Sequence, residues 1–180
     1  MTRGEVLFSG YNEAVEQGYN NVFKSMNKKN ALRGVGPEAE EIEKSVRESI
    51  KKWEETPIEA LDNLTPAQYI SGIKDFDYII ELFKEGSRIC HESMPSIFLE
   101  KMKEYGNKAV EAVMKLAADK NLLENSKETD IPVMAVRVLG EWKVDWAVDK
   151  LIELLIDTAG ENELFADSIK DALISIGEPS

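Results

Sequence analysis

The residue types best suited to covalent chemistry stand together at Cys90-His91-Glu92. A thiolate beside an imidazole can act as a nucleophile, but the two side chains must face each other. Neighbouring residues on a helix point about 100° apart, so Cys90 and His91 would not meet directly. We therefore interpret Cys90 as a small buried side chain beside a surface histidine.

Metal-binding and phosphate-binding patterns are absent from the sequence. A structural zinc site needs four ligands, and the chain has one cysteine and one histidine. Glu-x-x-His pairs of helical di-metal sites and Asp-rich calcium loops do not occur. Gly34-x-Gly36 lacks the third glycine and the preceding strand of a dinucleotide-binding loop. We expect no catalytic, cofactor-binding or metal-binding residues.

An exposed tryptophan is the stronger sign of a functional surface. If the stripe that contains Leu151 faces the core, Trp146 lies about 160° away on the helix, beside Lys150 and Glu153. Tryptophan flanked by charges suits a protein contact, because tryptophan is enriched at interface hot spots. The alternative is that Trp146 packs on the preceding repeat. The same two interpretations apply to Trp142 in the inserted turn. The hypothesis is a protein-binding face that includes Trp142, Trp146, Lys150 and Glu153.

Charge and composition narrow the classes of partner. The 180-residue chain carries 34 acidic against 22 basic residues, a net charge of −12. This charge repels phosphate backbones and anionic lipids, so we expect another protein as partner, and no nucleic acid or membrane. A single cysteine excludes an internal disulfide and fits a reducing compartment. The sequence predicts no signal peptide or membrane span, and we expect a cytoplasmic protein.

The spacing of apolar residues predicts helices throughout the chain. Helices over 5–32 and 37–54 come first, and others follow a capping box at Thr65 and an N-cap at Asp75. The helix that begins after Asp75 is expected to end at Gly86. In the first helix, Gly10 and Gly18 each cost about 1 kcal/mol relative to alanine, which predicts a frayed or bent early part. Its apolar face comprises Val15, Tyr19, Val22, Phe23 and Met26. No segment alternates with period two, so the fold class is all-α.

Two segments of the C-terminal half look like copies of one unit. Ala109 and Ala147 are 38 residues apart (147 − 109), and so are Asp119 and Asp157 (157 − 119). A fixed period of this length is typical of stacked helical hairpins, each too small to bury its own apolar stripe. The turn between the two helices of each copy is assigned to a glycine, Gly106 in the first and Gly140 in the second.

The second copy resembles a known repeat. It reads Val133-Met134-Ala135-Val136-Arg137-Val138-Leu139-Gly140, then Ala147-Val148-Asp149-Lys150-Leu151-Ile152-Glu153-Leu154-Leu155-Ile156-Asp157. This pattern is similar to a HEAT-like repeat of the short bacterial kind, the PBS-lyase HEAT type. The chain departs from it by inserting 142–145 in the turn and by lacking a clean arginine before the first copy. The resemblance implies a superhelix of helix pairs that holds other proteins, and it transfers no catalytic residues.

We therefore expect an α-α superhelix of stacked antiparallel helix pairs over 93–180, preceded by an N-terminal helical subdomain over 1–92. The predicted function is a non-enzymatic protein-interaction scaffold. The alternative is an enzyme-associated or lyase-like helical protein with a pocket between the halves, where strongly shifted carboxylates would be expected. The last helix, 163–176, should be covered by a partner, a capping contact or partly by solvent. Self-association through this C-terminal helix therefore stays open.

Overall fold

The structure, a computed structural model, describes residues 1–29, 37–90, 92–158 and 162–178, and for residues 25–29 it describes the backbone only. Within these ranges the chain is all-helical, with one isolated bridge between Ile58 and Leu64. None of the described helices combines the length and the apolar character that a bilayer crossing requires. The helices are α1 (Arg3–Lys29), α2 (Ala39–Glu55), η1 (Glu59–Leu61), α3 (Pro66–Gly72), α4 (Phe76–Ile89), α5 (Ser96–Lys103), α6 (Asn107–Ala117), α7 (Lys120–Glu124), α8 (Asp130–Glu141), η2 (Asp145–Ala147), α9 (Val148–Asp157) and α10 (Glu163–Gly177).

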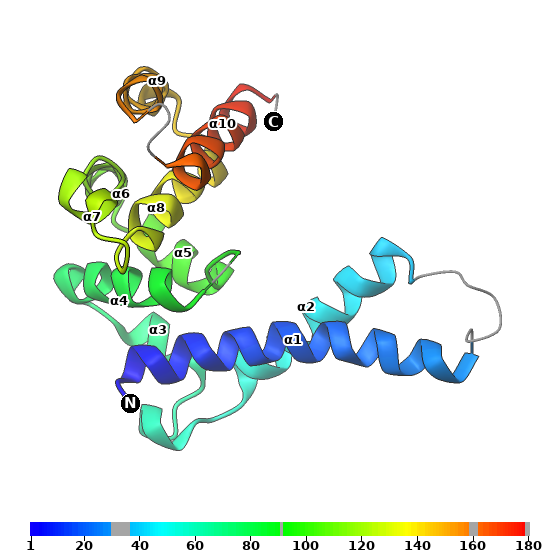
Figure 1. The fold of residues 1–180 in the computed structure, drawn as a ribbon. Helices are drawn as coiled ribbons and strands as arrows, with labels where there is room; N and C mark the ends of the chain where they lie inside the picture. The colour runs from blue at the N-terminus through cyan, green and yellow to red at the C-terminus, as the bar shows by residue number, and fades with distance from the viewer. Residues whose placement is uncertain (30–36, 91, 159–161, 179–180) are drawn as a thin grey trace.

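Helix α1 runs along the base of the molecule, and α2 returns beside its C-terminal part (Figure 1). The two helices approach closely because Gly18 faces the backbone of α2: a Cβ at Gly18 would lie 2.4 Å from the Cα of Val46. The Ser45 hydroxyl donates a 2.8 Å hydrogen bond to the Gly18 carbonyl. Gly10 likewise faces the ring of Trp53. Gly10 and Gly18, which predicted a frayed or bent helix, therefore lie within the continuous helix α1, where the lack of a side chain lets α2 pack closely.

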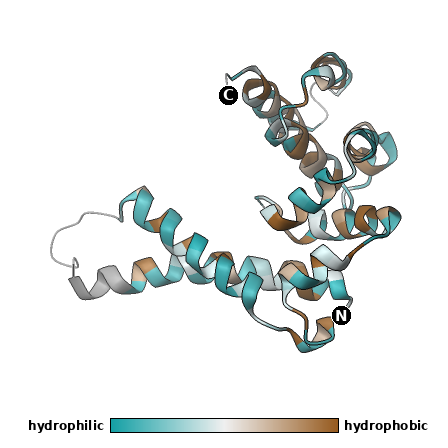
Figure 2. Cartoon of the chain, turned by 180° about the vertical axis from the view of Figure 1, so that it is seen from behind, coloured by the Kyte–Doolittle hydropathy of each residue, from teal (hydrophilic) through white to brown (hydrophobic). Residues whose placement is uncertain are grey.

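The C-terminal helices form a stack that rises from the N-terminal part of α1 (Figure 1). Helix α8 lies at its centre and packs against α4, α6 and α10, while α9 packs against α10. Val133 and Val136 are buried together with the main stripe of α8, because neighbouring helices cover α8 on more than one side. Figure 2 shows apolar residues concentrated in these helices, whereas the outer part of the α1–α2 hairpin is largely hydrophilic.

The two glycines assigned to equivalent turns occupy different positions. Gly106 does precede a helix, at φ 56°, directly before α6. Gly140 instead lies inside α8, and a Cβ there would meet the Cα of Ala172 at 2.7 Å. The left-handed residue of the second turn is Lys143, with φ 51°. The assignment of Gly140 to the turn was therefore wrong, because its role is close packing of α8 against α10.

Local sequence signals placed several helix starts correctly and one helix end wrongly. Thr65 forms the expected capping box with Gln68, and Asp75 accepts hydrogen bonds from the backbone of α4. Asp119 caps the short helix α7. Gly86 does not end α4, which continues to Ile89, because this glycine makes room for the ring of Phe8.

One buried core runs through both halves of the chain. The Phe8 ring of α1 meets the Phe98 ring of α5 edge-on, with centroids 5.4 Å apart. The division into 1–92 and 93–180 stays a prediction, but apolar side chains pack across it.

Candidate functional site

Cys90 lies in surroundings that make its thiol unreactive. Cys90 follows the last turn of α4 and is buried, and burial raises the pKa of its thiol to about 12. At neutral pH the thiol is therefore protonated and poorly reactive. His91 lies outside the described residues, as do Gly34 and Gly36.

The four residues of the predicted binding face divide into an exposed group and a packed one. Trp146 in η2 is 56% exposed. One helical turn later, Lys150 pairs with Glu153 at 2.8 Å on the surface of α9. Trp142, in contrast, packs against the core, and its indole nitrogen is buried without a hydrogen-bond partner. The structure thus leaves Trp146, Lys150 and Glu153 as a surface and turns Trp142 mainly inward.

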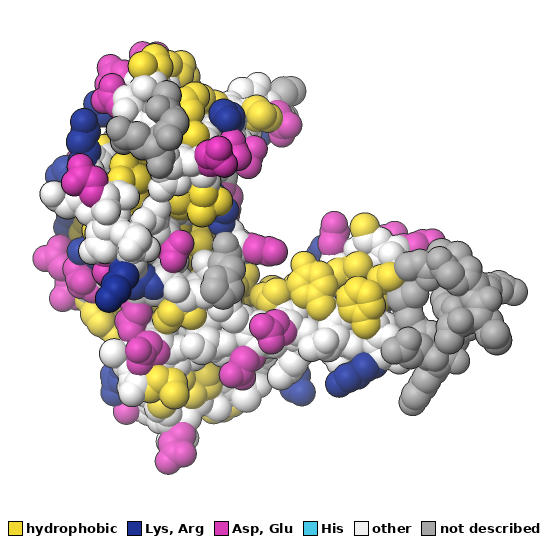
Figure 3. All heavy atoms as spheres, in the orientation of Figure 1, with side chains coloured by type: hydrophobic (Ala, Val, Ile, Leu, Met, Phe, Trp, Pro, Cys, Tyr) yellow, Lys and Arg dark blue, Asp and Glu magenta, His cyan; other side chains and the backbone are white. Residues whose placement is uncertain are grey.

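A groove whose lining residues the sequence did not single out lies where the α1–α2 hairpin meets the rest of the molecule. Figure 3 shows the hollow between the hairpin and the C-terminal stack, with apolar side chains on the hairpin surface that faces it. The groove has a volume of about 450 Å³. We call it the α1–α2 groove, and its lining residues are Tyr11, Asn12, Val15, Glu16, Tyr19, Val46, Ile50, Glu92 and Ser93.

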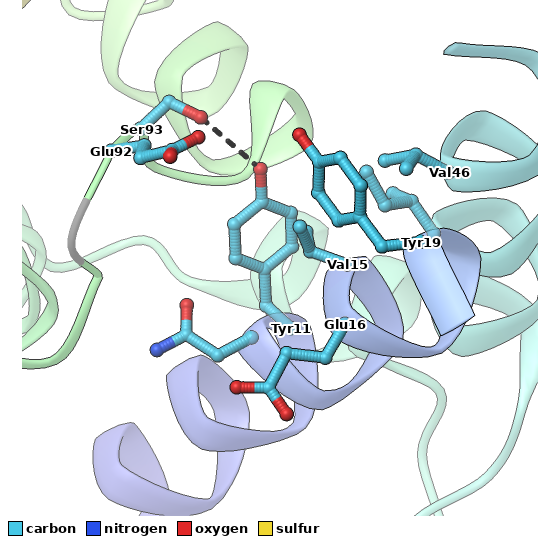
Figure 4. A pocket seen from close by; sticks show the side chains of 9 residues that line it. Tyr11, Val15, Glu16, Tyr19, Val46, Glu92 and Ser93 are labelled. Atoms are coloured by element: carbon cyan, nitrogen blue, oxygen red, sulfur yellow. Dashed lines mark hydrogen bonds between the residues drawn. The ribbon is translucent and has the colours of Figure 1, made fainter. Parts of the chain in front are cut away.

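The geometry of the α1–α2 groove is set by hydrogen bonds at its inner end. The Tyr11 hydroxyl and Ser93 Oγ are 3.3 Å apart, and Asn12 donates to the Ile89 carbonyl at 2.7 Å. Burial raises the pKa of Tyr11, and the carboxylates of Glu141 and Glu92 add to the rise. In Figure 4 the rings of Tyr11 and Tyr19 leave α1 in the same direction. These hydrogen bonds hold Tyr11 and Asn12 at the inner end of the groove, and the Tyr19 ring lines the groove as well.

Apolar side chains continue from the groove along α1. Val15, Tyr19 and Phe23 are four residues apart and share one side of the helix. Tyr19 is 40% and Phe23 52% exposed, so the expected apolar face of α1 is only partly covered. Val22 is buried, and the Met26 side chain lies outside the described ones. The periodicity grouped these residues on one face, whereas in the structure Val22 lines a hollow together with residues of α2, and Tyr19 and Phe23 stay partly exposed.

The other side of the hairpin is polar. Away from the groove, a shallow hollow between the two helices is lined mainly by polar and charged side chains: Asn21, Val22, Glu41, Lys44, Ser45 and Glu48. The hairpin is therefore amphipathic as a unit, with one apolar side that faces the hollow of the molecule.

The described lining of the α1–α2 groove combines apolar side chains with two carboxylates. Its described lining residues include no cysteine, histidine, lysine or arginine, and their charged members are Glu16 and Glu92. Beside it, the Arg137 guanidinium donates to the backbone carbonyl of Glu92 at 3.2 Å. The described residues hold no group of three or more His, Cys, Asp or Glu side chains arranged for a metal ion. Compared with known proteins, the chain matches no family model, no curated protein and no solved structure.

Proposed function

We propose that the protein is a non-enzymatic interaction scaffold whose α1–α2 groove binds a segment of another protein. The observation that carries this proposal is the row of Val15, Tyr19 and Phe23, which leads out of the groove onto the open hairpin surface. Monomeric soluble proteins rarely expose contiguous apolar surface without a binding role, and aromatic side chains dominate interface energetics.

In the same proposal, residues 93–180 are HEAT-like helix pairs that carry the N-terminal subdomain. Helix α8 supports this interpretation, because it packs between α6 and α10 and is buried on nearly all sides. Stacked hairpins need such cover on both sides. The left-handed residues between paired helices, Gly106 and Lys143, are 37 positions apart (143 − 106), close to the 38-residue repeat.

The alternative, a lyase-like protein with a pocket between the halves, has less support. The groove does contain Glu92 and Ser93, at the boundary between the halves. A catalytic pocket would need carboxylates whose pKa is shifted by their surroundings. Burial raises the pKa of Glu54 and of Glu141, but neither residue lines the groove.

Site-specific crosslinking tests the proposal. A photo-reactive phenylalanine analogue at Tyr19 should crosslink a partner protein, whereas the same analogue at Asn21, on the polar side, should not. The crosslinked protein, once purified, should bind the wild-type chain at least about tenfold more tightly than Tyr19→Ser, as expected for truncation of a hot-spot aromatic. Tyr19 is half-exposed, so this substitution leaves the fold intact.

A second surface gives the experiment its control. Trp146→Ala removes an exposed aromatic side chain of similar size far along the chain. If the partner binds Tyr19→Ser as well as the wild type, the groove is not its site. If binding of the partner is lost with Trp146→Ala instead, the binding site is the face formed by Trp146, Lys150 and Glu153.

A further inference from the structure

We infer that the occupant of the α1–α2 groove is an amphipathic helix whose apolar face is flanked by lysine or arginine. The inference rests on the proposed function and specifies the chemistry of the partner. Three observations carry it: the helical backbone of the two long walls of the groove, the length of the apolar row and the charge of the lining residues.

The walls of the groove favour a helix over an extended segment. The two long walls are α1 and α2, whose backbone N–H and C=O groups bond within each helix, so neither offers an edge to which a strand could add. Glu92 and Ser93, from the segment before α5, line only the inner end. An extended peptide on Tyr19 and Val46 would leave its own backbone groups unpaired against apolar side chains. A helix pairs these groups internally and presents only side chains.

The apolar row has the length of a short helix. Tyr11 and Phe23 are twelve residues apart on α1, which corresponds to about 18 Å along the helix axis. A partner helix of about three turns therefore spans the row. Its apolar side chains would sit on Tyr11, Val15 and Tyr19 on one side and on Val46 and Ile50 on the other.

The charge of the groove selects among amphipathic helices. Its charged lining residues are Glu16 and Glu92, and the Glu141 carboxylate is near enough to Tyr11 to act on its pKa. Lysine or arginine beside the apolar face of a partner helix would meet these carboxylates. A second copy of the chain would instead bring Glu16 and Glu92 towards the same acidic residues, with a net charge of −12 on each molecule.

Two designed peptides test the inference on the full chain. Both are helical, of about 18 residues, with the same leucine face, and they carry either lysine or glutamate at the flanking positions. Binding is measured by fluorescence anisotropy at low and at high salt. We expect the lysine peptide to bind at least about tenfold more tightly than the glutamate peptide, with the difference shrinking at high salt because exposed charges are screened.

Charge reversal in the groove supplies the matched variants. Glu16→Lys should weaken the binding of the lysine peptide about three- to fivefold, as expected for loss of an exposed ion pair. The same substitution should strengthen the binding of the glutamate peptide. Glu48→Lys makes the same charge change on the polar side of the hairpin and should leave the ranking unchanged. Tyr19→Ser should weaken both peptides, because it removes apolar contact that they share.

Each contrary result has a distinct meaning. The inference of a partner helix flanked by lysine or arginine is overturned if the two peptides bind equally well. It is also overturned if Glu16→Lys and Glu48→Lys change the affinity of the peptides equally. The proposed function then survives if Tyr19→Ser still weakens both peptides. Insensitivity of both peptides to Tyr19→Ser removes the groove as a docking site altogether. A concentration-dependent dimer in light scattering that Tyr19→Ser dissociates identifies the occupant as a second copy and overturns the inference.

Discussion

Trp146 and Trp142 are four residues apart, yet their surroundings differ. Trp146 is exposed on η2, whereas Trp142 packs against the core. We expect Trp146→Ala to change the free energy of unfolding by less than about 0.5 kcal/mol, because more than half of this side chain is exposed to solvent. Trp142→Ala should cost about 2–4 kcal/mol, since it leaves a cavity beside the core. Urea denaturation followed by circular dichroism measures both, and equal costs would contradict this difference in packing.

Cys90 provides a test in alkaline solution. Burial raises the pKa of its thiol from 9.0 to about 12. Below pH 9 the thiol is protonated in both the folded and the unfolded chain, whereas between 9 and 12 the unfolded chain loses the proton first. The stability that this shift contributes is therefore lost as the pH rises through that window.

The measurement compares wild type with Cys90→Ala across this window. The Cys90 thiolate also raises the pKa of Tyr11, so removing Cys90 removes both effects. The free energy of unfolding should therefore fall more steeply with pH in the wild type. At neutral pH a thiol reagent should react with Cys90 only as fast as the chain opens. Fast labelling of the folded protein would show that the thiol is accessible.

At the scale of helices, the sequence predicted what depends on neighbours within one helix. The capping box at Thr65, the cap at Asp75 and the apolar stripes follow from contacts within a turn or two. Gly86 and Gly140 were misread because a glycine in a helix has a local meaning, as a stop, and a distant one, as room for a neighbour. The distant meaning requires the packing partner, Phe8 or Ala172, which lies 78 or 32 positions away (86 − 8, 172 − 140).

The groove escaped prediction for a related reason. Its residues come from α1, α2 and the segment before α5, and no periodicity links these parts of the chain. Tyr19 and Phe23 belong to the apolar face predicted for the first helix, and the pattern does not show which part of that face a neighbour covers. Only the arrangement of α2 shows that this side of the stripe remains open.

The α1–α2 hairpin allows local and packing effects to be separated. In an isolated helix Gly18→Ala would stabilise by about 1 kcal/mol. In the hairpin the new Cβ would lie 2.4 Å from the Cα of Val46, so α2 must move away. We expect a net destabilisation of about 1–3 kcal/mol. Gly72→Ala, at the end of α3 with open space around it, is the control and should not destabilise the protein. A stabilised Gly18→Ala variant in thermal denaturation would refute the close approach of α1 and α2.

At the scale of the whole molecule, the outer surface of helix α10 is the candidate surface for self-association. Helix α10 buries Phe165, Ile169 and Ala172 beneath its neighbours, whereas Ile174 on its outer side is exposed. The C-terminal helix is thus covered by α8 and α9 on one side and by solvent on the other. Self-association through this outer side stays a prediction, and light scattering of Ile174→Ser beside the wild type tests it separately from the groove.

The continuous core predicts that the two halves unfold together. Phe8 and Phe98 touch across the boundary between 1–92 and 93–180, and α4 packs against both α1 and α8. Separating the halves would expose these buried surfaces to water, so neither half is expected to stay folded when the other opens. Tryptophan fluorescence can follow each half: Trp53 reports on α2 in a chain with Trp142→Phe and Trp146→Phe, while Trp53→Phe leaves the C-terminal pair.

Both reporters should give one urea midpoint, and Phe98→Ala should lower both midpoints together, by about 3–5 kcal/mol in the free energy of unfolding. Two separate midpoints would instead show independent domains. In that case the angle between hairpin and stack would vary, and the α1–α2 groove, which draws Glu92 and Ser93 from the chain beyond α4, would not keep its shape. A single cooperative transition is therefore the result expected if the α1–α2 groove has a fixed shape before a partner binds.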